Sequence, residues 1–181
     1  CLSLVGSEMC IRDRTCTGLY TWNAEFVNCR FSEIPYVYNV KIRGIKSRVE
    51  NCLFTNMDWW ANPGGGGAEL GYIARYVTFE NSKIGGLGGS HLMEYCRIED
   101  FKDPCDCSGI NRGAHGAPRS MTRYNWIING PGANGIRIDG GANGAGNRRG
   151  DIHHIITIGN NRGMRLKGDF HDVHHITAYD N

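Results

Sequence analysis

Two stretches near the end of the chain decide the fold: Ile152-His153-His154-Ile155-Ile156-Thr157 and, 21 residues later, Val173-His174-His175-Ile176-Thr177-Ala178. Both read as an apolar residue, any residue, then Asn, Tyr or His, followed by a small or apolar residue, any residue and usually a second apolar one. Earlier copies of this motif place their third residue at Asn28, Asn51, Tyr76, Tyr95 and Tyr124. The third residues of the seven copies are spaced 23, 25, 19, 29, 30 and 21 positions apart. A strand-like unit that returns every roughly 20 to 30 residues is typical of a solenoid in which each repeat forms one coil.

The composition of the repeat favours strands over helices. The copies are rich in Val, Ile, Phe, Tyr and Thr, whereas a leucine-rich repeat would need Leu at regular offsets. The 26 glycines among 181 residues provide for many tight turns. A second strand type follows several copies, at residues 40–44, 135–140 and 163–168. We therefore expect two or three short strands in each coil.

This organisation resembles the right-handed parallel β-helix superfamily, the pectate-lyase-like group, over about residues 20–181. The resemblance implies an all-β fold, a right-handed parallel β-helix solenoid of about seven coils. It also implies a secreted protein, extracellular or periplasmic. It implies little about activity, because the repeat is architectural.

Residues 1–14 stand apart from the repeat and resemble the translation of a sequencing-library adapter. We expect 1–14 to be a non-native leader and 15–181 to be one parallel β-helix domain, incomplete at both ends. The net charge of +2 does not favour nucleic acid as a partner. No apolar run is long enough to span a membrane.

Three cysteines share the fourth position of the motif: Cys29, Cys52 and Cys96. Other copies carry Val, Ile or Asn at this position, which predicts an inward-facing column with Cys as a small buried hydrophobe. Stacked coils lie about 4.8 Å apart, so a disulfide between Cys29 and Cys52 is an open alternative.

The second strand type predicts a charged row on the outside of the solenoid. Side chains alternate along a strand, so stacking successive coils places Arg137 beside Arg165 and Asp139 beside Lys167. Arg and Lys bind carboxylates and sulfates, and the row therefore predicts a groove for an acidic polysaccharide. A charged row that only keeps the exterior soluble is the alternative.

The leading reaction for such a groove is β-elimination by a polysaccharide lyase. A base must take the proton next to a uronate carboxyl while cations stabilise the developing enolate. We assign Lys167 as the base, Arg137 and Arg165 as substrate and enolate contacts, and Asp139 as the residue that orients Lys167 or holds calcium. Calcium is the only candidate cofactor, and no metal ligand is assigned beyond this alternative role of Asp139.

Two other functions remain open from the sequence. A glycoside hydrolase would need two carboxylates facing one cleft. A non-catalytic carbohydrate-binding or adhesion β-helix, of the phage-tail type, would need no cleft at all. Further candidate substrate-binding residues are Asn111, Arg112, His171, Trp59 and Trp60.

The histidines form a second cluster. Matching repeat positions predict that His153 lies near His174 and His154 near His175. We expect His154 and His175 to take the turn position of the motif and to hydrogen-bond the backbone. Metal binding or proton transfer is the alternative for this cluster.

Overall fold

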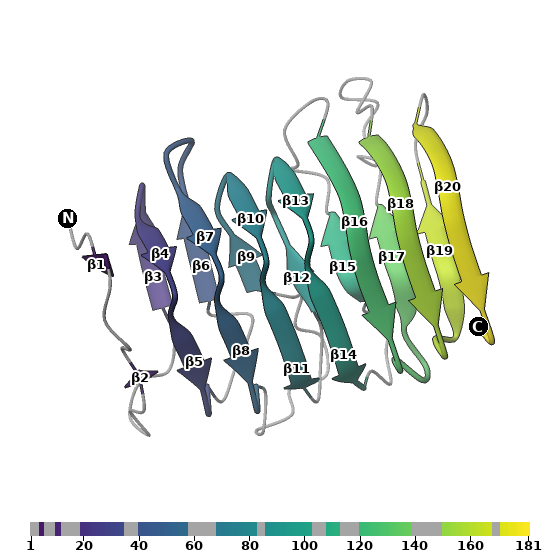
Figure 1. The fold of residues 1–181 in the computed structure, drawn as a ribbon, viewed down its shortest axis with the longest axis horizontal. Coiled ribbons are helices and arrows are strands. Elements are labelled where there is room, and N and C mark those ends of the chain that lie inside the picture. The colour runs from purple at the N-terminus through teal and green to yellow at the C-terminus, as the bar shows by residue number, and fades with distance from the viewer. Residues whose placement is uncertain are drawn as a thin grey trace.

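The computed structural model of the chain describes residues 4–5, 10–11, 19–34, 40–57, 68–82, 86–102, 108–112, 120–138, 150–167 and 171–181. Every regular element among these residues is a strand, and all strand pairs are parallel (Figure 1). The strands stack as a parallel β-solenoid of about five turns, which confirms the predicted architecture. The expected count of about seven coils is slightly higher than the count in the structure. No described segment is a helix that could cross a membrane.

The larger sheet has 13 strands and lies at the front in Figure 1. Its strands before the motif's third residue are β4 (Glu25–Val27), β7 (Arg48–Glu50), β10 (Ile73–Arg75) and β13 (Leu92–Glu94). Those after it are β5 (Arg30–Ser32), β8 (Leu53–Thr55), β11 (Thr78–Ser82) and β14 (Arg97–Phe101). Two short strands ahead of the first motif copy, β1 (Leu4–Val5) and β2 (Cys10–Ile11), pair with β4 and β5. Three strands run through both halves: β16 (Ser120–Ile128), β18 (Gly150–Ile158) and β20 (Asp172–Tyr179).

The second sheet has seven strands and lies behind the first in Figure 1. Its strands are β3 (Leu19–Trp22), β6 (Val40–Arg43), β9 (Ala68–Leu70), β12 (Leu87–Gly88), β15 (Ser108–Arg112), β17 (Asn134–Ile138) and β19 (Arg162–Leu166). The predicted second strand type therefore forms a sheet of its own.

The third residue of every motif copy has a left-handed backbone conformation. Its φ angle lies between 50° and 57° in all seven copies: Asn28, Asn51, Tyr76, Tyr95, Tyr124, His154 and His175. A left-handed residue interrupts the alternation of the strand, so two successive side chains face outward. Arg75 and Tyr76 illustrate this, since neither is buried while Ala74 and Val77 on either side are. We call these seven residues the left-handed column.

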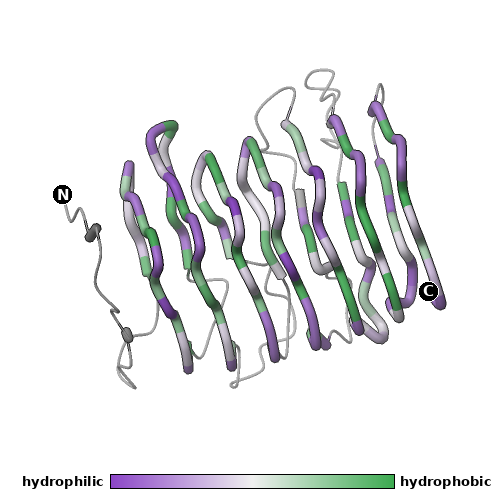
Figure 2. The backbone as a smooth tube through the Cα atoms, viewed as in Figure 1, coloured by the Kyte–Doolittle hydropathy of each residue, from purple (hydrophilic) through white to green (hydrophobic). Residues whose placement is uncertain are grey.

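The core consists of inward-facing columns, one residue from each coil. Figure 2 shows hydrophobic and hydrophilic residues alternating along the strands that supply them. In one column Phe31 stacks on Phe54 with ring centroids 4.5 Å apart, and Phe54 lies 6.4 Å from Phe79. The register continues this column through Ile98 and Ile127.

The cysteine column faces inward, as predicted. Cys29, Cys52 and Cys96 are buried, and all three are free thiols, so the alternative of a Cys29–Cys52 disulfide is not realised. The Cys52 thiol donates to the Glu50 carbonyl at 3.2 Å. Burial raises the pKa of Cys52 to about 11 and that of Cys96 to about 12. These cysteines therefore act as neutral packing residues.

Candidate functional site

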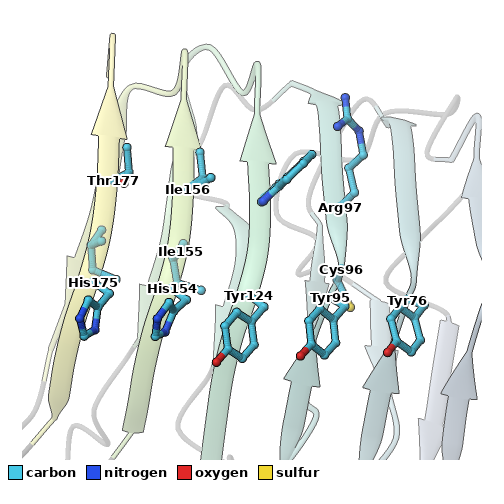
Figure 3. Close-up of a pocket in the computed structure, with 12 residues that line it drawn as sticks. Tyr76, Tyr95, Cys96, Arg97, Tyr124, His154, Ile155, Ile156, His175 and Thr177 are labelled. Carbon is cyan, nitrogen blue, oxygen red and sulfur yellow. The ribbon is translucent and has the colours of Figure 1, made fainter.

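A shallow groove of about 790 Å³ runs across the outer face of the larger sheet, over the coils of Tyr76 to His175. Its first wall is the aromatic part of the left-handed column. Its second wall is formed by residues two positions further along each strand, where Arg97, Ile156 and Thr177 lie (Figure 3). The residues between the walls face inward, so the floor of the groove is mostly backbone.

The first wall is a continuous ladder of five stacked rings, which we call the aromatic ladder: Tyr76, Tyr95, Tyr124, His154 and His175. Successive ring centroids lie 5.2, 5.1, 4.7 and 4.6 Å apart. These distances follow the spacing of parallel strands, about 4.8 Å. Because each ring face covers the next, the ladder presents hydroxyl groups and ring nitrogens, and Figure 3 shows the tyrosine hydroxyls on the same side.

The second wall combines an aromatic ring with a cation. Trp126 is 49% exposed, and the Arg97 guanidinium lies 5.7 Å from its ring centroid. Arg97 also donates to Glu99 through Nε at 2.7 Å, and this hydrogen bond raises the pKa of Arg97. The wall therefore offers an indole ring beside a permanent positive charge.

A charged column supports the aromatic ladder from the opposite side. Glu94 is only 4% exposed, and its two carboxylate oxygens each lie 2.6 Å from an arginine Nε, that of Arg75 and that of Arg123. The guanidinium of Arg123 also lies 5.8 Å from the ring centroid of Tyr124. The buried carboxylate thus links three successive coils directly beside the ladder.

The four histidines form two hydrogen-bonded pairs at one end of the ladder. Nδ1 of His153 lies 2.7 Å from Nδ1 of His154, and the same distance joins His174 to His175. The predicted stacking is confirmed, with centroids 4.8 Å apart for His153 and His174 and 4.6 Å for His154 and His175.

The turn position predicted for His154 and His175 is also confirmed, since both have φ of 52°. The expected hydrogen bond to the backbone is replaced by one to the neighbouring ring. The reason is that the left-handed residue and the one before it face outward together, which brings their two rings into contact. His153 is mostly buried, and burial lowers its pKa.

Among the described residues, no group of three or more His, Cys, Asp or Glu is arranged to hold a metal ion. Asp139, the candidate calcium ligand, lies outside the described residues. Trp59 and Trp60, the candidate stacking residues, also lie outside them.

The predicted basic row lies on the second sheet, away from the groove. Arg137 pairs in register with Arg165, as expected, and Asn111 pairs with Arg137 in the preceding coil. Arg112 pairs instead with Ile138, so it belongs to a different column from the arginines. Lys167 follows β19 directly, is exposed, and donates its backbone N–H to the Ile138 carbonyl at 2.8 Å.

His171 bridges backbone groups rather than facing the groove. Its Nδ1 accepts from the Gly150 N–H at 3.2 Å, and its Nε2 lies 3.0 Å from the Lys167 carbonyl. The sequence-based site is thus only partly assembled among the described residues, with Asn111, Arg137 and Arg165 in one column.

The groove itself was missed at the sequence level. The motif treated Asn, Tyr and His as equivalent turn residues. Because a turn requires no aromatic ring, the rings at this position needed a separate explanation, which the sequence analysis did not give. The succession of aromatic residues at the third position, with Trp126 two residues after Tyr124, was the available signal.

No family model, curated protein or solved structure matches the chain. The fold defines it as a parallel β-solenoid, and the groove is the feature that bears on its function.

Proposed function

We propose that this is a secreted, pectate-lyase-like β-helix protein that binds an acidic polysaccharide along the groove and cleaves it by β-elimination. The observation that carries the proposal is the straight run of the groove across successive coils. The ladder lines one side of it, and Trp126 and Arg97 line the other.

The groove suits an extended polymer because its chemistry repeats. Strands stack at about 4.8 Å, so equivalent groups recur at a fixed interval along the solenoid axis. Tyrosine hydroxyls and histidine nitrogens can both donate and accept hydrogen bonds with sugar hydroxyls. The indole of Trp126 offers an apolar ring for the face of a sugar, and Arg97 offers a fork of donors for a carboxylate or sulfate.

The same groups can support β-elimination. A neutral imidazole of the ladder can accept the proton next to the uronate carboxyl, a tyrosine hydroxyl can donate a proton to the leaving oxygen, and Arg97 can neutralise the carboxylate. Hydrolysis with paired carboxylates is less well supported, because the described lining of the groove includes no Asp or Glu.

The basic column of the second sheet is the other place where this chemistry could occur, with Lys167 as the base and Arg137 and Arg165 as anion contacts. The two sites lie on different sheets, so single variants separate them. Binding without cleavage would favour the non-catalytic adhesion function.

The test measures both binding and turnover with residues 15–181. Affinity electrophoresis against polygalacturonate, alginate and chondroitin sulfate reports binding, and ultraviolet absorbance of unsaturated uronate products reports cleavage, with and without calcium. We expect Trp126→Ala to weaken binding about tenfold, as truncation of a central aromatic contact commonly does. Trp22→Ala is the matched control, because Trp22 is 69% exposed on β3 of the second sheet.

A second matched pair tests the cation. Arg97→Ala should weaken binding, whereas Arg30→Ala should not, since Arg30 occupies the same outward column on β5, outside the groove. If Arg165→Ala and Lys167→Ala abolish binding while the groove variants bind normally, the site belongs to the second sheet. If no polymer of the panel binds a chain that is folded by circular dichroism, the proposal is wrong.

A further inference from the structure

We propose that His154 and His175 form a proton-dependent anion subsite, which takes a carboxylate or sulfate group when their rings are protonated. The inference rests on the proposed function where the anion is part of the polysaccharide. The subsite itself can be tested with inorganic sulfate alone.

The hydrogen bond inside each pair fixes which nitrogen takes the proton. The contact of 2.7 Å between Nδ1 of His153 and Nδ1 of His154 needs one N–H donor and one lone pair. His153 is the mostly buried ring, and burial favours its neutral form. Asp151 Oδ1 lies 3.9 Å from Nε2 of His153 and favours the proton on that nitrogen, which leaves Nδ1 as the acceptor. His154 therefore carries its first proton on Nδ1, and a second proton must go to Nε2.

The next coil repeats the geometry of this pair, although His174 is exposed where His153 is buried. His174 and His175 are in the same register as His153 and His154, and their Nδ1 atoms also lie 2.7 Å apart. Among the described residues, Nε2 of His154 and Nε2 of His175 have no hydrogen-bond partner, and both rings line the groove. Two equivalent nitrogens of adjacent coils are thus available to one ligand group.

The stacking couples protonation to anion binding. The two rings lie 4.6 Å apart and are inclined by only 16°, so two imidazolium cations would repel each other across the stack. An anion that accepts from both Nε2–H groups offsets this repulsion. Anion binding therefore promotes proton uptake, and by linkage acid promotes anion binding.

The surroundings do not supply the anion from within the protein. The titratable and charged groups that face the two pairs are Tyr124 and Arg123 on β16, Asp151 and His153 on β18, and Asp172 and His174 on β20. Asp151 lies 3.9 Å from Nε2 of His153, and Asp172 pairs with Asp151 in register, two residues before His174. Among the described residues, neither carboxylate forms an ion pair with His154 or His175. Arg123 adds positive charge on the same side and is held by Glu94.

The first measurement is an NMR titration of the histidine rings from pH 8 to pH 5 in sulfate and in chloride at equal ionic strength. We expect sulfate to move the titration of His154 and His175 to higher pH and to leave His91 unchanged. His91 lies outside the groove and stacks on Tyr72 at 4.5 Å. Equal titrations in the two salts would overturn the subsite, whatever happens with polysaccharides.

The second measurement is polysaccharide affinity as a function of pH. For the natural chain we expect a gain of roughly three- to tenfold from pH 8 to pH 5.5, since each exposed ion pair contributes modestly. The double variant His154→Asn, His175→Asn should lose this gain, so that its affinity is the same at pH 8 and at pH 5.5. Asn is a suitable replacement because Asn28 and Asn51 occupy the same left-handed position in the first two coils.

The matched control is His91→Asn, which should keep the full pH-dependent gain. A double variant that retains the gain would overturn the inference even if the groove binds polysaccharide. If sulfate moves the ring titration but no polymer binds at any pH, the subsite stands and the proposed function fails.

Discussion

The first two motif copies and the five that follow build the same left-handed column with different side chains. Asn51 donates to Asn28 through its side-chain amide at 2.6 Å, whereas Tyr95 and Tyr124 stack their rings at 5.1 Å. The φ angles of both regions fall in the same narrow range, 50° to 57°. Asn is among the residues that adopt this conformation most readily, and bulky residues adopt it at a cost. The fold therefore does not need the aromatic rings, and they occur where the groove lies.

The charged column beside the ladder differs between the same two regions. Glu50 pairs with Arg48 of its own strand at 3.0 Å, and its side chain is 25% exposed. Glu94, two coils later, is shared by two arginines of neighbouring coils. The coils that carry the groove are thus cross-linked more strongly than the first ones.

The largest expected effect tests whether the early coils depend on their phenylalanine column. Phe54→Ala removes a ring that is fully buried between Phe31 and Phe79. We expect a loss of about 3–5 kcal/mol in the free energy of unfolding, measured by urea denaturation. The folded fraction should still bind polysaccharide, because each repeat of a solenoid contacts only its neighbours. Loss of binding in a sample that remains folded would show that the two regions are not independent.

The next effect compares the two carboxylates of the charged column. Glu94→Ala leaves two arginines without their shared carboxylate, and we expect a loss of roughly 2 kcal/mol, less than for a fully buried pair because both arginines reach solvent. Glu50→Ala should cost less than about 1 kcal/mol, as exposed ion pairs do. Urea denaturation of the two variants checks this order. Equal losses would contradict the stronger cross-linking of the groove coils.

These two regions also show why the sequence predicted the scaffold better than the site. The motif marks the inward positions, which packing restricts to apolar or small residues in nearly every coil. The column of Cys29, Cys52 and Cys96 was therefore correctly predicted to face inward. The stacking of His153 on His174 followed from the same register. A solenoid repeats its backbone, and a repeated sequence pattern therefore predicts most of its geometry.

The outward positions carry no such restriction, and this is where the prediction of the site departed from the structure. Arg137 and Arg165 do pair in register, but Asn111 takes the matching position in the preceding coil, so Arg112 belongs to the neighbouring column. Trp126 and Arg97 come from different coils, and the wall that they form depends on that register. A groove between two outward columns can therefore be recognised only once the alignment of the coils in three dimensions is known.

The third-largest expected effect is a loss of stability at high pH, and it is caused by the buried thiols of the cysteine column. The folded protein holds the pKa of Cys52 at about 11 and that of Cys96 at about 12, above the ordinary thiol value of 9.0. Above pH 9 the unfolded chain therefore releases protons that the folded chain retains, and stability falls as pH rises. Below pH 9 the two thiols should have no effect on the pH dependence.

The measurement is the free energy of unfolding at pH 7, 9 and 10, with a reductant present. The double variant Cys52→Val, Cys96→Val should lose less stability between pH 9 and pH 10 than the natural chain. Val is the matched replacement, because Val77 fills the same buried column in the coil between them. Parallel profiles for the two proteins would show that other groups cause the alkaline loss.

The smallest expected effect on stability returns to the left-handed column itself. Tyr95→Asn removes a ring that stacks on Tyr76 and Tyr124, and such contacts are worth about 0.5–1.5 kcal/mol each when well packed. Asn relieves the cost of holding a bulky residue at positive φ, which offsets part of that loss. We therefore expect stability to change by less than about 1 kcal/mol, while polysaccharide affinity falls because the wall of the groove is interrupted.

The variant Asn51→Ala, in the early coils, should do the reverse. It should cost about 1 kcal/mol of stability, because the side-chain hydrogen bond to Asn28 is lost and Ala is strained at positive φ, and it should leave binding unchanged. If Tyr95→Asn instead destabilised the fold and spared binding, the aromatic ladder would be part of the scaffold, and the difference between the two regions would have no functional meaning.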